Sequence, residues 1–173
     1  MSDRTANTIR QIDLGLVLVA IGACIASLIH PARALLFISI PVGVMGAITL
    51  LAAGARFGIF QRGGGLSRLY STQVSMIRGA ASGSHQLSKV VGAVGLIGGI
   101  VTAFFGVTQA GSGKYVQVNG KYEDVAVYPA VIVSKHAYDV SNVIAPIHLA
   151  AGVGLTFCAM SLLLIGAGSP SNS

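Results

Sequence analysis

The chain has 173 residues, of which 53% are hydrophobic and only 9% are charged, and its formal net charge at pH 7 is +6. Because soluble domains carry about 25% charged residues, this composition excludes an ordinary soluble globular protein. We predict a single integral membrane domain over residues 1–173, with no room for a separate soluble domain.

Four apolar stretches, separated by polar segments, fill most of the chain. Each is close to the roughly 20 residues that a helix needs to cross about 30 Å of hydrocarbon. The pattern predicts an all-α membrane protein, a bundle of four transmembrane helices at 14–29, 35–55, 90–109 and 143–166. Within these limits there is no Asp, Glu, Lys or Arg. We therefore expect no proton relay and no carboxylate-based ion site inside the membrane, because such sites require ionisable groups there.

The first two stretches contain small residues at a spacing of four. Gly22 and Ala26 lie in the first stretch, and Gly43 and Ala47 lie in the second. In lipid, such pairs let helix backbones approach closely, so that van der Waals contacts hold the helices together. We predict that both pairs pack against other helices.

The segment between the second and third stretches is basic. It contains five cations and no acidic residue: Arg56, Arg62, Arg68, Arg78 and Lys89. Because lysine and arginine gather on the cytoplasmic side, we expect this segment and both termini to be cytoplasmic and the cations to contact lipid headgroups. Apolar residues recur at helical spacing over 66–78, which predicts an amphipathic helix at the membrane interface. We expect no nucleic-acid partner, since interleaved aromatic residues and a recognition fold are both missing.

The third stretch has the longest face of small residues, which consists of Gly95, Gly99 and Ala103. Packing within one bundle explains such a face. Because every stretch carries small residues, we also expect assembly into a homo-oligomer or a larger membrane complex.

The loop over 110–142 changes from a helical period to a strand pattern. Asn119-Gly120, a dipeptide favoured in tight hairpin turns, separates the short extended runs 114–118 and 121–125. A third run follows, and its Pro129 confines it to a sheet edge or a bulge. We predict a small extracytoplasmic β-hairpin cap between the third and fourth helices.

Tyrosines are concentrated in this loop, including Tyr115, Tyr122 and Tyr128. Aromatic belts at the membrane interface have this composition, and so do protein-recognition surfaces. The sequence leaves open whether these three residues form a belt or dock a partner.

Two histidines, His30 and His148, mark the outer ends of the first and fourth stretches. Imidazole is a ligand of metal ions and of haem iron, so one interpretation is a shared cofactor site. The other is that His30 reaches the interface and His148 hydrogen-bonds a neighbouring carbonyl, because their spacing matches no ligand motif. The sequence identifies no particular cofactor and no metal site.

The sequence contains no catalytic, nucleotide-binding or metal motif, so we do not expect an enzyme. Its organisation is typical of a non-catalytic structural or accessory subunit that assembles with itself or within a larger membrane complex. One alternative is an oligomeric pore lined by polar residues such as Ser39, Thr49 and Thr102. Another is a membrane subunit that carries a haem or a metal on the outer histidines.

Overall fold

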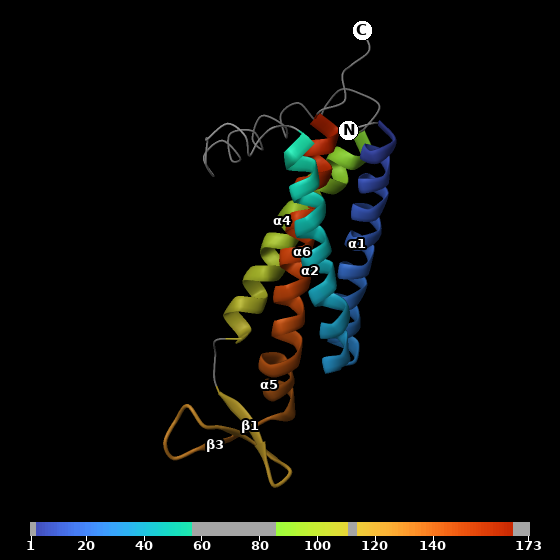
Figure 1. Cartoon of the computed structure of the whole chain (residues 1–173). Coiled ribbons are helices and arrows are strands. Elements are labelled where there is room, and N and C mark those ends of the chain that lie inside the picture. Colours follow the sequence, from blue (N-terminus) through green and yellow to red (C-terminus); the bar gives the residue numbers. More distant parts are fainter. Residues whose placement is uncertain (1–2, 57–85, 111–113, 168–173) are drawn as a thin grey trace.

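Four long helices run side by side in the computed structural model, which describes residues 3–56, 86–110 and 114–167 (Figure 1). They are α1 (Asp3–Ile29), α2 (Leu36–Arg56), α4 (Gln86–Ala110) and α6 (Ala145–Ala167). Each belongs to a segment long and apolar enough to cross a membrane, which indicates a multi-pass membrane protein. The amphipathic helix predicted at 66–78 lies outside the described residues, as do Arg62, Arg68 and Arg78.

The first helix extends well beyond the apolar stretch that predicted it. It begins at Asp3 rather than near Leu14, and Ile9 in this added part is buried. The helix continues through polar sequence because Ile9 and Asp13, four residues apart, lie on the same face and pack inward. A short 3₁₀ turn, Arg33–Leu35, then leads into α2.

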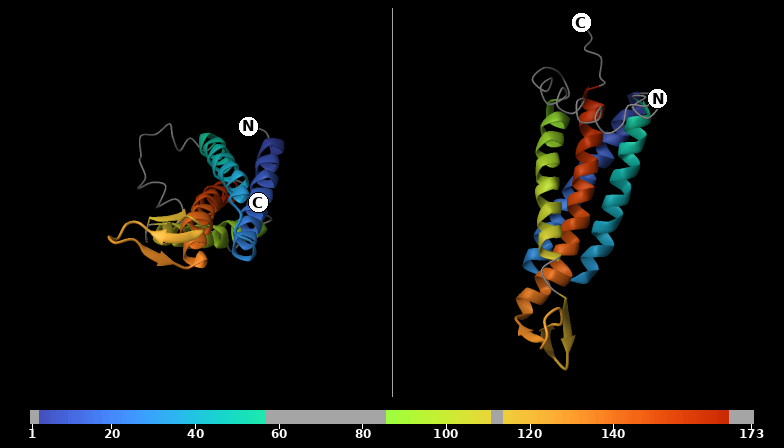
Figure 2. Two further views of the ribbon diagram at one scale, coloured as in Figure 1. Left: turned by 90° about the horizontal axis from the view of Figure 1, so that it is seen from below. Right: turned by 90° about the vertical axis from the view of Figure 1, so that its left-hand side faces the viewer.

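Helix α6 is the centre of the bundle and contacts each of the other three long helices. In its most apolar stretch 61% of the residues are buried inside the chain, against 17–28% in the other three. Figure 2 shows α1 and α2 on one side of α6 and α4 on the other. The core is a cluster from α1, α2 and α6 that includes Val17, Ala20, Val42, Ala151, Leu155, Cys158 and Leu162.

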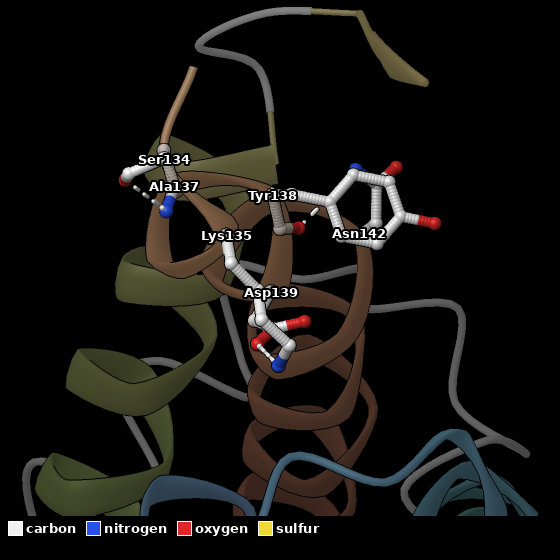
Figure 3. Close-up of polar contacts among 6 residues, drawn as sticks. All are labelled: Ser134, Lys135, Ala137, Tyr138, Asp139 and Asn142. Atoms are coloured by element: carbon white, nitrogen blue, oxygen red, sulfur yellow. Dashed lines mark hydrogen bonds and ion pairs between the residues drawn. The ribbon is translucent and has the colours of Figure 1, made fainter. Parts of the chain in front are cut away.

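The helical segment that leads into the fourth span begins at Lys135, inside the loop predicted over 110–142. Residues Lys135–Asp139 form a short helix, α5, and Val140–Ile144 form a π turn that continues directly into α6. Ser134 caps this helix, because its hydroxyl accepts a hydrogen bond of 3.1 Å from the amide of Ala137 (Figure 3). Lys135 Nζ also contacts a carboxylate oxygen of Asp139 at 2.6 Å, one turn later.

A three-stranded antiparallel sheet follows α4, in the order β1 (Tyr115–Val118), β2 (Lys121–Asp124) and β3 (Val131–Val133). Val118 pairs with Lys121 across the hairpin, and the turn residues Asn119 and Gly120 both have positive φ, 48° and 78°. These values fit the tight turn that the dipeptide predicts. The third strand is an edge strand that begins after Pro129, in agreement with the effect of proline on strand pairing.

The sheet lies beyond the helix ends, at the opposite end of the bundle from the start of α1 and the end of α6 (Figures 1 and 2). We call residues 115–133 the cap, and we call the two ends of the bundle the cap end and the termini end.

Candidate functional site

One face of α1 packs against α6 through residues that are buried at helical spacing. Val17, Ala20 and Ala23 form the apolar middle of this face. A buried polar side chain stands at each end of it, Asp13 toward the termini end and Ser27 toward the cap end. We call the contact between α1 and α6 the seam.

At the cap end of the seam, His148 on α6 hydrogen-bonds Ser27 on α1. Its Nε2 atom lies 3.1 Å from the hydroxyl oxygen of Ser27, and the same hydroxyl donates to the carbonyl of Cys24 at 2.7 Å. A hydroxyl has one proton, so we assign Nε2 as the donor in the bond between the two side chains. The ring also packs on Phe105 of α4, with centroids 5.2 Å apart. His148 thus links three helices.

The two histidines of the predicted cofactor pair lie in different surroundings. His30 follows the last residue of α1 and is exposed, whereas His148 is buried and its Nε2 is already bonded to Ser27. In the part of the chain that the structure describes, no three His, Cys, Asp or Glu side chains are grouped so that they could hold a metal ion. Haem or metal binding by His30 and His148 stays a prediction.

At the termini end of the seam, the structure corrects the expectation that no acidic residue lies inside a span. Asp13 is part of the membrane-spanning segment of α1 and has no exposed surface. It faces Thr49 of α2 together with Cys158 and Ser161 of α6. The apolar run begins at Leu14, one residue after Asp13, so a span limited to this run leaves out a residue that the helix face includes.

A signal for Asp13 was nevertheless present in the sequence. Asp13, Val17, Ala20 and Ser27 recur at intervals of three, four and seven residues, which places them on one face of a helix. Continuing that face one turn before Val17 leads directly to the carboxylate.

The small residues of α4 lie against the backbone of α6. A Cβ atom added to Gly99 would be 2.7 Å from the hydroxyl of Thr156, and one added to Gly152 would collide with the backbone nitrogen of Ala103. At Gly95 the nearest atom would be Cβ of Ala159, at 3.4 Å. The two backbones therefore approach as closely as small residues allow in a membrane.

The small pairs of α1 and α2 have different surroundings. Gly43 lies near the carbonyl of Ala150, at 3.6 Å from an added Cβ, while none of the described residues comes within 4 Å of one added to Gly22. Ala26 is half-buried, and Ala47 lines an open apolar groove of about 650 Å³ between α2 and α6. The Gly22 position is thus open to lipid or to another chain.

Two of the five cations predicted to contact lipid lie in described helices, both at the termini end. Arg56 is the last residue of α2, and Lys89 lies in the first turn of α4. The side-chain stem of Lys89 lies against α6, where a Cβ added to Gly166 would be 3.0 Å from its Cγ. Both positions are compatible with the membrane surface.

Side-chain contacts attach the cap to the bundle. Arg33, in the turn between α1 and α2, donates to the hydroxyl of Tyr138 at 2.9 Å. The ring of Tyr138 packs against that of Tyr122 in β2, with centroids 4.8 Å apart. Asn142, in the π turn, donates to the carbonyls of Tyr115 and Tyr138 (Figure 3 shows the second bond).

The three tyrosines predicted to dock a partner therefore differ. Tyr115 and Tyr122 are half-buried and take part in these attachments. Tyr128, in the connection between β2 and β3, is 99% exposed. Of the three, only Tyr128 presents its whole side chain to a partner.

No protein-family model, no curated protein and no solved structure matches this chain.

Proposed function

We propose that the chain is a non-catalytic structural or accessory subunit of a membrane assembly, formed with copies of itself or with other membrane proteins. In this proposal the termini end and the basic segment face the cytoplasm, where the cations contact anionic lipid. The cap then faces the opposite side and is available to the partner.

The observation that carries this proposal is the apolar surface of the cap. Tyr128 is 99% exposed, and Val127, Val131 and Ile132 beside it are 51%, 51% and 64% exposed. Large apolar side chains exposed on one short segment outside the helix bundle are typical of an interaction site. Tyrosine is also one of the residues that contribute most binding energy at interface centres.

The attachment of the cap supports the same role. Asn142 bonds the cap to the π turn, and Tyr122 packs on Tyr138 of α5, whose hydroxyl accepts a hydrogen bond from Arg33. A surface that is already ordered loses less conformational entropy when it binds than a mobile loop does. The cap is therefore prepared to bind before the partner arrives.

The uncovered glycines of α1 provide a second surface for assembly. Gly15 and Gly22 are exposed, and no atom of the described part of the chain lies within 4 Å of a Cβ added to either. They are seven residues apart and so lie on one face of the helix. A helix of another chain can approach this face closely in lipid.

The pore alternative receives less support from the polar residues that it requires. Ser39 and Thr49 are buried inside the single bundle, and each donates a hydrogen bond to its own helix, to Leu35 and Gly46 respectively. Such bonds satisfy hydroxyls without water. Both side chains lie inside the bundle of one chain, whereas Thr102 of α4 is half-buried.

Native mass spectrometry of the protein released gently from its own membranes tests the proposal. A closed homo-oligomer identifies a self-assembling subunit, and a stoichiometric complex with other chains identifies an accessory subunit. Recovery of the monomer alone, also after crosslinking in the membrane, would contradict the proposed role.

A pair of cap variants then locates the interface. We expect Tyr128→Ser to weaken the assembly at least about fivefold, the loss typical of an interface residue worth more than 1 kcal/mol. Gln117→Ser is the matched control, because Gln117 is an exposed polar residue of β1 in the same cap. Equal affinities of both variants and the wild type would exclude the cap as the interface.

A further inference from the structure

The carboxyl group of Asp13 lies inside the bundle without a hydrogen-bond partner among the residues that the structure describes. Its side chain has no exposed surface, and neither Oδ1 nor Oδ2 is bonded. An ionisable residue within a membrane-spanning segment is costly to bury, and such residues usually mark sites of proton or ion binding. The proposed role in assembly makes no use of it.

The groups that face Asp13 are neutral and polar. Thr49 of α2, and Cys158 and Ser161 of α6, are turned toward the carboxyl group and are themselves buried. The hydroxyl oxygen of Ser161 has no partner either. Three unbonded polar atoms therefore lie together: two carboxyl oxygens and one hydroxyl.

The Thr49 hydroxyl already donates its hydrogen elsewhere, and this determines which protonation state of Asp13 fits the cluster. The Thr49 hydroxyl donates to the carbonyl of Gly46 at 2.9 Å, so it offers only lone pairs to Asp13. An ionised carboxylate is purely an acceptor, and it would face another acceptor there. A protonated carboxyl group, by contrast, donates to a hydroxyl oxygen of Thr49 or Ser161 while its carbonyl oxygen accepts from the Ser161 hydroxyl or the Cys158 thiol.

We propose that Asp13 is a proton-binding site inside the seam, in which the protonated carboxyl group is held by Ser161 and Thr49. The proton comes from water, forms one O–H bond on a carboxyl oxygen and leaves by the reverse step. A metal cation fits less well, because Ca²⁺ and Mg²⁺ require at least six oxygen ligands. The neighbouring side chains supply two hydroxyl oxygens and a weakly coordinating thiol.

The position of Asp13 gives the proton a direction of access. Toward the cap end, the seam is filled by apolar side chains such as Val17, Ala20 and Leu155. Toward the termini end, the polar start of α1 is close, and Arg10 lies three residues before Asp13 on the same helix. Cys158 is the titratable group that faces the carboxyl group from α6, while α2 presents the non-titrating Thr49. We therefore expect exchange with the water at the termini end.

Infrared spectroscopy of the full-length protein in lipid nanodiscs tests this site. The protonated carboxyl group has a carbonyl stretching band that the carboxylate lacks. We expect the difference spectrum between the wild type and Asp13→Asn at neutral pH to contain this band. Its intensity should correspond to one protonated carboxyl group per chain. In the pH range where Asp13 titrates, the ratio of its protonated to its ionised form should fall about tenfold for each increase of one pH unit.

A second pair of variants keeps Asp13 in place. Ser161→Ala removes a hydroxyl that faces the carboxyl group and should shift its carbonyl band. Ser39→Ala is the matched control, because Ser39 is equally buried but bonds to Leu35 of its own helix. A band that moves in neither variant or in both would contradict the assigned partners.

Two results would overturn the proposal. A difference spectrum that shows only carboxylate at neutral pH would mean that Asp13 is ionised and paired with a cation. A carboxylate that responds to added sodium ions at constant pH would assign the site to a metal ion instead. Both results are independent of whether the chain forms an assembly.

Discussion

Nε2 of His148 lies 3.1 Å from the hydroxyl oxygen of Ser27, although 121 residues separate the two in sequence. The Ser27 hydroxyl donates its proton to the carbonyl of Cys24, so the imidazole is the donor and Ser27 the acceptor. Each partner is buried, and the bond joins α6 to α1 at the cap end of the bundle. It fixes the depth at which the two helices meet.

Ser27→Ala should destabilise the bundle by about 0.5–1.5 kcal/mol, because it removes the hydroxyl that accepts the hydrogen bond of the buried His148 ring. Reversible unfolding in mixed micelles measures the free energy of unfolding. Ser134→Ala is unsuitable as a control because it removes a helix cap, whereas His136→Ala replaces an exposed imidazole and should change little. If Ser27→Ala is as stable as the wild type, the hydrogen bond does not hold the helices together.

Gly99→Ala should separate α4 from α6. The added methyl carbon would be 2.7 Å from the hydroxyl and 2.8 Å from the backbone nitrogen of Thr156, and backbone atoms cannot rotate away. We expect a loss of about 1–3 kcal/mol, the usual cost of an overpacked contact.

Gly98→Ala is the matched control for this change, since it adds the same atom one residue away. Nothing lies within 4 Å of a Cβ added to Gly98, so alanine there should be neutral or slightly stabilising in a helix. Unfolding of both variants in the same micelles makes the comparison. Equal stabilities would mean that the close contact at Gly99 is not required for packing.

The four long helices could be predicted because the length and polarity of each stretch are properties of local sequence. The hairpin turn was predictable for the same reason, since Asn119-Gly120 determines its own backbone conformation. The third strand and its pairing with β2 depend on contacts between distant residues, and the sequence indicated only an extended run there.

The candidate sites were harder to predict, because they depend on which helix faces meet. Asp13 borders the apolar stretch by one residue; its spacing places it on the face of Val17 and Ala20, and its contact with α6 shows that this face is inside. His148 was singled out, but its partner Ser27 lies on another helix and could not be identified from spacing. Gly22 shows the same limit, since a small residue is equally suited to a buried and to an exposed face.

Tyr138→Phe should loosen the cap without unfolding the bundle. The variant removes the hydroxyl that accepts a hydrogen bond of 2.9 Å from Arg33 but keeps the ring that packs on Tyr122. Because the Arg33 bond is exposed, we expect a loss of no more than about 1 kcal/mol in global stability. Hydrogen–deuterium exchange should nevertheless become faster in the Arg33–Leu35 turn and in β2.

Tyr128→Phe is the control for this experiment, because it removes the same hydroxyl from a tyrosine that is 99% exposed. A double-mutant cycle with Arg33→Gln isolates the interaction, since either single change already breaks the bond. The effects of the two changes on exchange should overlap rather than add. Fully additive effects would show that Arg33 and Tyr138 act independently, and the attachment of the cap would then depend on Asn142 and on the contact between Tyr122 and Tyr138.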